Sequence, residues 1–161
     1  MGPPAATPAL ASTAGKWTPA FTDAVQVTPL SDKHRGELQL ATERALQQWA
    51  KNVFAPQEIV SAMERIVLFL RQNGGASRQA RQVASLAFII GEQVVQLGGW
   101  KWMSVSDDGS VNPAIVSPDG GRACLVVDVM TLLVAGEEKS SLGSLVRACV
   151  QNEPHALVVP V

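Results

Sequence analysis

The sequence predicts an α+β domain in which helices pack on one side of a small antiparallel sheet. Three segments with helical spacing of apolar residues come first, a group of short strands separated by turn residues follows, and two further helical segments come last. Strands grouped in this way are typical of α+β folds, whereas strands alternating with helices would predict a parallel sheet. The chain has 161 residues, of which 47% are hydrophobic and 17% charged. That composition is sufficient for one domain with a hydrophobic core.

The sequence divides into three parts. Residues 1–29 contain five of the ten prolines, are rich in Ala and Thr, and lack helical or strand periodicity, so we predict a disordered tail. Trp17, Pro19 and Phe21 form a small aromatic island in this tail that could dock on the domain or on a partner, the alternative being a loosely tethered segment without function. Residues 30–153 are expected to form the single α+β domain, and residues 154–161 a C-terminal tail or a short edge strand.

The most apolar helical pattern begins near Ser77 and is expected to lie in the middle of the fold. Its apolar residues recur at the spacing of one helical face: Val83, Ala87, Ile90, Val94 and Leu97. Gly98 and Gly99 are expected to end the helix, because glycine readily adopts the left-handed conformation found there. A strand should follow from Trp100 to Val105, with both of its tryptophans on one face. We expect Trp100 in the core and Trp102 nearer the surface.

Capping residues and prolines mark the first two helices. Ser31 or Asp32 is expected to cap the first helix, because a short polar side chain can accept hydrogen bonds from free backbone N–H groups. Pro56 suits the first turn of the second helix, where its missing N–H is not needed. Asn73 and Gly74 are expected to end that helix.

Turn residues divide the next part of the chain into a three-stranded meander. Asp107-Asp108-Gly109 should reverse the chain after the first strand. Pro113 cannot donate to a sheet ladder, which predicts a short second strand over residues 114–116 or a place at the sheet edge. The continuous apolar run 123–127 predicts a third strand that is buried on both faces.

Two more helices are expected after the meander. Asp128 is a natural cap for a short helix that begins at Val129 and ends at Gly136. Ser140 or Ser141 can begin the last helix.

Charge and cysteine content narrow the class of protein. The formal net charge is −1. Residues 31–81 carry an excess of Lys and Arg, and residues 82–161 an excess of Asp and Glu, but no basic face typical of nucleic-acid binding stands out. Apolar runs are too short to span a bilayer, and two cysteines fit a reducing compartment. We therefore expect a soluble cytoplasmic protein that binds neither nucleic acid nor membrane.

Few residues suit nucleophilic catalysis. Cys124 and His155 could meet in space, but a cysteine inside an apolar strand usually acts as a small hydrophobic residue. No Cys-x-x-Cys, His-x-x-x-His or His-Glu-x-x-His spacing is present, so the sequence predicts no metal and no cofactor.

Carboxylates offer a second kind of site. Asp107, Asp108 and Asp119 could gather at one end of the meander for a cation or for acid–base chemistry, although Asp is also a common turn residue. Glu92 is the one charged residue between Arg81 and Lys101, so burial would force it to find a partner or raise its pKa. Alternatively, Glu92 faces solvent along a narrow polar stripe of the central helix.

The glycine-rich connector before the central helix carries Arg78 and Arg81. Free amides at a helix N-terminus attract anions, yet the connector lacks the spacing of a phosphate loop and follows a helix instead of a strand. We interpret it as a solvated connector and, secondarily, as an alternative binding surface.

In outline, three features resemble small bacterial domains of uncharacterised function. They are the run LAFIIGEQVVQLGGWKW at residues 86–102, the polar turn after it, and the third strand leading into DVMTLLVAGEE at residues 128–138. Some domains of this general build act as immunity proteins that block a toxin. The resemblance spans about residues 35–150, and no catalytic residue is carried over from it.

These observations lead to two functional hypotheses. The first is a non-enzymatic protein-binding module, such as an immunity protein, adaptor or secretion chaperone, which uses Trp102 with Asp107 and Asp108 as its contact surface. The alternative is a small enzyme or small-ligand binder with a carboxylate-lined site near Glu92 and the same turn. The sequence leaves the partner and the oligomeric state open.

Overall fold

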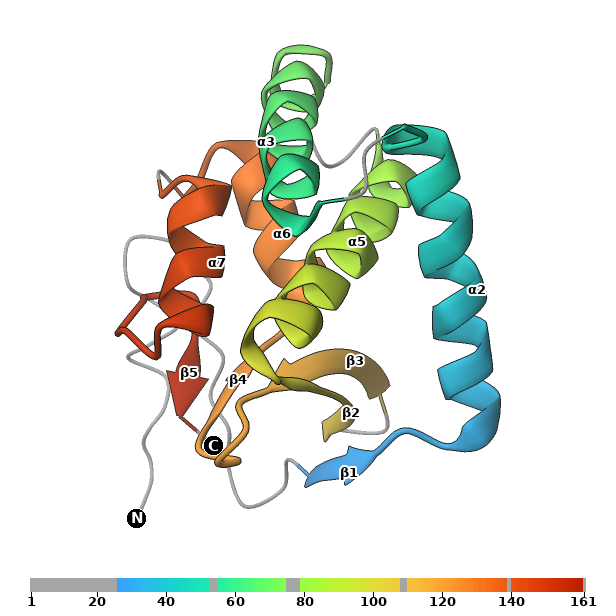
Figure 1. The fold of residues 1–161 in the computed structure, drawn as a ribbon, viewed down its shortest axis with the longest axis vertical. Helices are drawn as coiled ribbons and strands as arrows, with labels where there is room; N and C mark the ends of the chain where they lie inside the picture. The colour runs from blue at the N-terminus through green and yellow to red at the C-terminus, as the bar shows by residue number, and fades with distance from the viewer. Residues whose placement is uncertain (1–25, 53–54, 75–78, 108–109, 139, 161) are drawn as a thin grey trace.

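The computed structural model describes residues 26–52, 55–74, 79–107, 110–138 and 140–160. Its helices lie together on one side of a five-stranded sheet, which confirms the predicted α+β class (Figure 1). The elements, in chain order, are β1 (Gln26–Pro29), α2 (Asp32–Trp49), α3 (Pro56–Gln72), α5 (Ala80–Gly98), β2 (Lys101–Asp107), β3 (Ser110–Val116), β4 (Arg122–Cys124), α6 (Val126–Ala135), α7 (Leu142–Val150) and β5 (Val159–Pro160). None of the described helices is long and apolar enough to cross a membrane.

The sheet is larger than the predicted meander. Its strands lie in the order β1-β2-β3-β4-β5, and every neighbouring pair is antiparallel. The predicted meander consists of β2, β3 and β4. Strand β5 lies at the sheet edge, which was one of the two alternatives expected for residues 154–161. The predicted tail boundary at residue 29 was wrong, because Gln26–Pro29 pairs with β2. The free backbone edge of β2 supplies the partners for these hydrogen bonds. Strand β1 can therefore form without an alternating side-chain pattern in its own sequence.

The second strand is longer than expected. β3 pairs with β2 from Ser110 to Val116, and Pro113 lies opposite Ser104. β4 pairs only with Ile115 and Val116, so Pro113 lies where β3 has one neighbour instead of two. A proline is tolerated at such a locally open edge, which is why it did not shorten the strand.

The third strand and the helix after it meet earlier than expected. β4 ends at Cys124 and α6 already begins at Val126, so the predicted strand over residues 123–127 was too long. Leu125 occupies the N-cap without a side-chain hydrogen bond, and Asp128 lies in the first turn instead of at the cap. Packing of Val126 in the core outweighs the strand preference of a β-branched residue.

The helix boundaries otherwise follow the capping residues. The Ser31 hydroxyl accepts from His34 N–H at 3.2 Å, and that of Ser141 accepts from Ser144 N–H at 3.0 Å. Pro56 begins α3. Helix α5 begins at Ala80, and the predicted cap Ser77 lies outside the described residues. Gly99 ends α5 with a left-handed φ of 72°.

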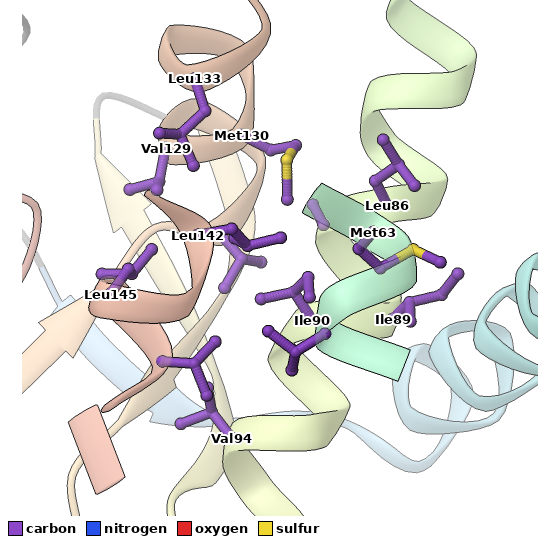
Figure 2. Packing of buried hydrophobic residues seen from close by; sticks show 14 of the residues in the cluster. Met63, Leu86, Ile89, Ile90, Val94, Val129, Met130, Leu133, Leu142 and Leu145 are labelled. Carbon is purple, nitrogen blue, oxygen red and sulfur yellow. The ribbon is translucent and has the colours of Figure 1, made fainter. Parts of the chain in front are cut away.

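The hydrophobic core surrounds α5, as its all-round apolar pattern predicts. Ile89 and Ile90 are 0% and 3% exposed. Figure 2 shows how side chains of α5 lie between Met63 of α3 and a group from α6 and α7 that includes Met130 and Leu145. Helix α5 therefore packs against other helices on several sides.

Polar contacts connect elements that are distant in sequence. The Glu64 carboxylate of α3 accepts from Gly143 N–H in the first turn of α7, where free N–H groups attract an anion. Arg71 Nε donates to Leu133 O near the C-terminal end of α6 at 3.1 Å. Trp100 Nε1 donates to Cys149 O at 3.0 Å, and the ring also lies 5.6 Å from the Arg122 guanidinium. These side-chain contacts stabilise the packing of one element on another.

Candidate binding groove around Trp102

Trp102 is half-buried and lies at the start of β2, shortly after the end of α5. Its indole packs against Gly91, and its Nε1 donates to Glu92 Oε1 at 3.1 Å. Trp100, by contrast, is 2% exposed, which confirms its assignment to the core. A ring that packs on the backbone and donates a hydrogen bond is held in one orientation. Trp102 thus forms a preorganised, partly accessible aromatic surface.

A groove of about 400 Å³ opens beside this ring, and we call it the Trp102 groove. It lies between α2 and the corner of α5 and β2. Its lining residues are Leu30, Arg35, Leu38, Gln39, Thr42, Glu43, Leu46, Glu92, Gln96 and Trp102. The apolar members are buried or half-buried and form the floor, whereas most of the charged and amide side chains are exposed and form the rim.

Helical spacing explains how α2 lines the groove. Leu38, Thr42 and Leu46 follow one another at intervals of four residues and lie on the floor. The rim residues of α2 are Arg35, Gln39 and Glu43, which repeat at the same interval one position further round. From residue 35 to residue 46 the helix rises about 16 Å, since each residue adds about 1.5 Å. The groove is therefore long enough for a short segment of another chain.

Glu92 links the two functional hypotheses. Its Oε1 accepts from Trp102, and its Oε2 accepts from Gln96 Nε2 at 3.0 Å. The side chain is half-buried and lies within the groove. Both alternatives from the sequence therefore apply in part: Glu92 has hydrogen-bond partners, as a buried carboxylate requires, and it also belongs to the polar stripe of α5. A carboxylate has about four acceptor positions, which leaves room for a further donor. Glu92 can therefore hold Trp102 and bind a ligand at once.

Most of the predicted acidic turn lies outside the described residues. Asp108 and the side chain of Asp107 lie outside the described residues, so their role in a contact surface stays a prediction. Along β2, residue 107 is five positions from Trp102, or about 17 Å in an extended strand. Among the described side chains, the carboxylate that hydrogen-bonds to Trp102 is that of Glu92.

Asp119 has a structural role in the turn before β4. Its Oδ1 accepts from Ser117 Oγ at 2.6 Å and from Gly121 N–H at 2.8 Å. These hydrogen bonds, first that of Ser117 and then that of Gly121, lower the pKa of the carboxyl below its usual range. Within the described residues no group of three or more His, Cys, Asp or Glu side chains is placed to hold a metal ion.

The surroundings of Cys124 and of His155 do not indicate a nucleophile and its base. Burial raises the pKa of the Cys124 thiol well above its usual value, whereas a nucleophilic cysteine needs a lowered pKa. His155 Nδ1 accepts from Leu157 N–H at 3.1 Å and is engaged in a local turn. Both cysteines are free and buried, which agrees with their interpretation as small hydrophobic residues.

The alternative basic surface lies far from the groove. Arg81 is exposed in the first turn of α5, and Arg78 lies outside the described residues. Eleven residues of helix, or about 16 Å, separate Arg81 from Glu92. The two surfaces are therefore distinct.

Sequence patterns did not reveal the α2 side of the groove. Arg35, Gln39 and Glu43 appear in the sequence as ordinary polar residues of an amphipathic helix. Only the packing of α2 on α5 brings them opposite Trp102. The one signal that could have suggested a surface role was their repetition at intervals of four residues beside a second, apolar stripe.

The fold and the groove define this chain as an α+β domain with a helix-lined surface groove. No protein-family model matches the chain, and a search of the curated proteins found no match. Among solved structures, the chain is similar to a protein from Bacteroides thetaiotaomicron VPI-5482, with a TM-score of 0.62 and 10% sequence identity over 80% of this chain. The match spans 48% of that protein, so the chain corresponds to about half of its length. At this identity the likeness concerns the fold alone.

Proposed function

We propose that this protein is a non-enzymatic protein-binding module whose contact surface is the Trp102 groove. The observation that carries the proposal is the preorganised indole of Trp102 on the floor of a groove with a charged rim. Tryptophans in such settings are frequent hot spots of protein interfaces, because they bury a large apolar area at little cost in conformational entropy. A role as an immunity protein, adaptor or secretion chaperone would use a surface of this kind.

The chemistry of the groove favours a basic segment of the partner. An Arg or Lys side chain that lies over the indole gains a cation–π interaction. The same cation would be within the groove that holds the Glu92 and Glu43 carboxylates. Arg35 on the rim would in turn suit an acidic or carbonyl group of the partner. A short segment with one basic anchor side chain therefore fits the groove best.

A peptide library provides a direct test. Full-length protein is used to select from random 12-residue peptides, and the selected peptides are titrated by calorimetry. We expect an enriched Arg or Lys beside apolar residues, and an affinity that falls as the salt concentration rises. Binding should also shift the NMR signal of the Trp102 indole N–H, because the peptide lies on that ring.

Charge-neutral variants locate the contact. Glu92→Gln should weaken the selected peptides about tenfold, which corresponds to about 1.4 kcal/mol, and Glu43→Gln about threefold. Glu37→Gln is the matched control, since this exposed glutamate of α2 lines a different cavity. Equal losses in all three variants, or peptides that leave the indole signal unchanged, would contradict the proposed surface.

The volume of the groove also supports the alternative of a small-ligand binder. Pockets for small ligands commonly measure about 300–1,000 Å³, a range that includes the groove. In that case a panel of small organic cations should raise the melting temperature, Glu92→Gln should abolish the rise, and no peptide should be enriched. The two outcomes separate the proposals.

A further inference from the structure

The face of the sheet that points away from the helices is also buried. Ile115 and Cys124 pair across β3 and β4 and belong to the core beneath the helices. Because side chains alternate along a strand, their neighbours lie on the opposite face. The buried residues of that outer face are Val105, Ala114, Val116, Ala123 and Val159, and they are 0% to 7% exposed.

The composition of the outer face is that of a covered surface. Antiparallel sheets with one face in water usually carry polar residues on that face. At one pair of positions on β2 this pattern is reversed, since Ser104 lies on the helix side while Val105 lies on the outer face. Lys101 and Asn112 are exposed at the rim of the outer face. An apolar centre within a polar rim indicates that something packs on the outer face.

The cover belongs to this chain. The exposed fractions are those of a single chain with no second molecule present, yet Ala114 and Ala123 are fully buried. Helices α5 and α6 contact the sheet on the side of Ile115 and Cys124. The described loop after α7 is held by Arg122, which donates to Glu153 O at 2.7 Å. Within the described part of the chain, no helix lies over the outer face.

The location and length of the remaining residues identify the cover. In the sequence, residues 53–54 lie between α2 and α3, residues 75–78 between α3 and α5, and residues 108–109 between β2 and β3, while residues 139 and 161 are single positions. Residues 1–25 are the one long segment outside the description, and they lead directly into β1 at the edge of this sheet.

The reach and chemistry of residues 1–25 are sufficient. Four strand spacings span about 19 Å between β1 and β5, and the nine residues from Trp17 to Val25 extend to about 30 Å. Charged side chains in residues 1–25 are limited to Lys16 and Asp23, while Trp17 and Phe21 supply aromatic area. We propose that residues 1–25 dock on the outer face of the sheet, with Trp17 and Phe21 as the anchors. The disordered tail that the sequence predicts is the alternative to this docking.

Trypsin offers a direct test on the full-length protein. Lys16 is the only lysine or arginine in residues 1–25, so cleavage after it reports whether the segment is docked. The Lys16–Trp17 bond should be cut at least about tenfold more slowly than in a synthetic peptide of residues 10–25, because a docked segment must open first. Cleavage at the peptide rate would overturn the proposal.

Two substitutions and one control complete the test. Val116→Asp places a charge on the outer face and should raise the cleavage rate about tenfold, toward that of the peptide. Phe21→Asp should also raise the cleavage rate about tenfold, and it leaves the sheet unaltered. This variant therefore tests the proposal even where Val116→Asp fails to fold. Asn112→Asp changes an exposed residue of the same face and should leave the rate unchanged. Unchanged cleavage in Phe21→Asp would count against the anchors.

Dilution distinguishes a second copy as the occupant. If the segment docks within its own chain, the cleavage rate of the parent protein is the same over a hundredfold range of protein concentration. Protection that disappears on dilution would assign the outer face to an interface between two chains and would refute the intramolecular docking.

Discussion

The six-membered ring of Trp102 lies against the backbone of Gly91, so closely that a Cβ on Gly91 would lie 2.6 Å from the ring atom Cζ2. The next residue, Glu92, accepts the indole hydrogen bond. An absent side chain and an adjacent carboxylate together fix the orientation of the ring. The groove therefore depends on α5 as much as on β2.

Gly91→Ala should displace Trp102 and change the groove. The new methyl group occupies the place of the ring, and overpacking of this kind typically costs about 1–3 kcal/mol of unfolding free energy. We expect weaker peptide binding and a shifted indole N–H signal, measured by urea titration and NMR.

Gly36→Ala is the matched control for that substitution. Gly36 lies inside α2, and a Cβ there meets nothing within 4 Å. Alanine favours helix over glycine, so this variant should be stabilised by about 0.5–1 kcal/mol. A Gly91→Ala variant as stable as the parent, with an unchanged indole signal, would contradict the close packing.

Ile90→Ala should destabilise the protein by about 2–5 kcal/mol, because it empties a site that is 3% exposed in the centre of the core. Leu40→Ala serves as the control, since Leu40 is 48% exposed, and should change the stability by less than about 0.5 kcal/mol. Denaturant titration measures both. A loss below about 1 kcal/mol for Ile90→Ala would remove α5 from its central role.

His155 should make stability depend on pH. Burial lowers its pKa below the usual range, although the Glu138 carboxylate acts in the opposite direction. The unfolded chain then binds the proton at a higher pH than the folded chain. The stability contributed by neutral His155 is complete above the unfolded pKa of about 6.5 and is lost as the pH falls toward the folded pKa.

The variant His155→Asn isolates this effect. Asparagine can accept the Leu157 N–H hydrogen bond without titrating. Between pH 7 and pH 5 the parent should lose more unfolding free energy than His155→Asn, while His34→Asn, at an exposed histidine, should behave as the parent. Parallel stability profiles for the parent and His155→Asn would show that folding leaves the pKa of His155 unchanged.

The cysteines should be unreactive in the folded protein. Burial is the main cause that raises the pKa of Cys149 to about 12, and it raises that of Cys124 as well. Thiol reagents attack the thiolate, so at pH 8 both residues should react at least about a hundredfold more slowly than in unfolding concentrations of urea. Rapid modification of the native protein would indicate that the core opens readily.

The sequence determined the fold class and most helix boundaries because these depend on local chemistry. Ser31, Pro56 and Gly99 mark helix ends through backbone geometry that each residue imposes on its own neighbourhood. The apolar pattern of α5 likewise predicted its central place, and the pattern alone was enough to assign Trp100 to the core.

Tertiary structure alone decided the rest. β1 exists because β2 offers a free backbone edge, and α6 begins at Val126 because that side chain packs in the core. The pairing of Trp102 with Glu92 and the approach of α2 likewise arise from packing between elements. Contacts of this kind are set by how whole surfaces fit, and a linear pattern of residue types does not record which surfaces meet.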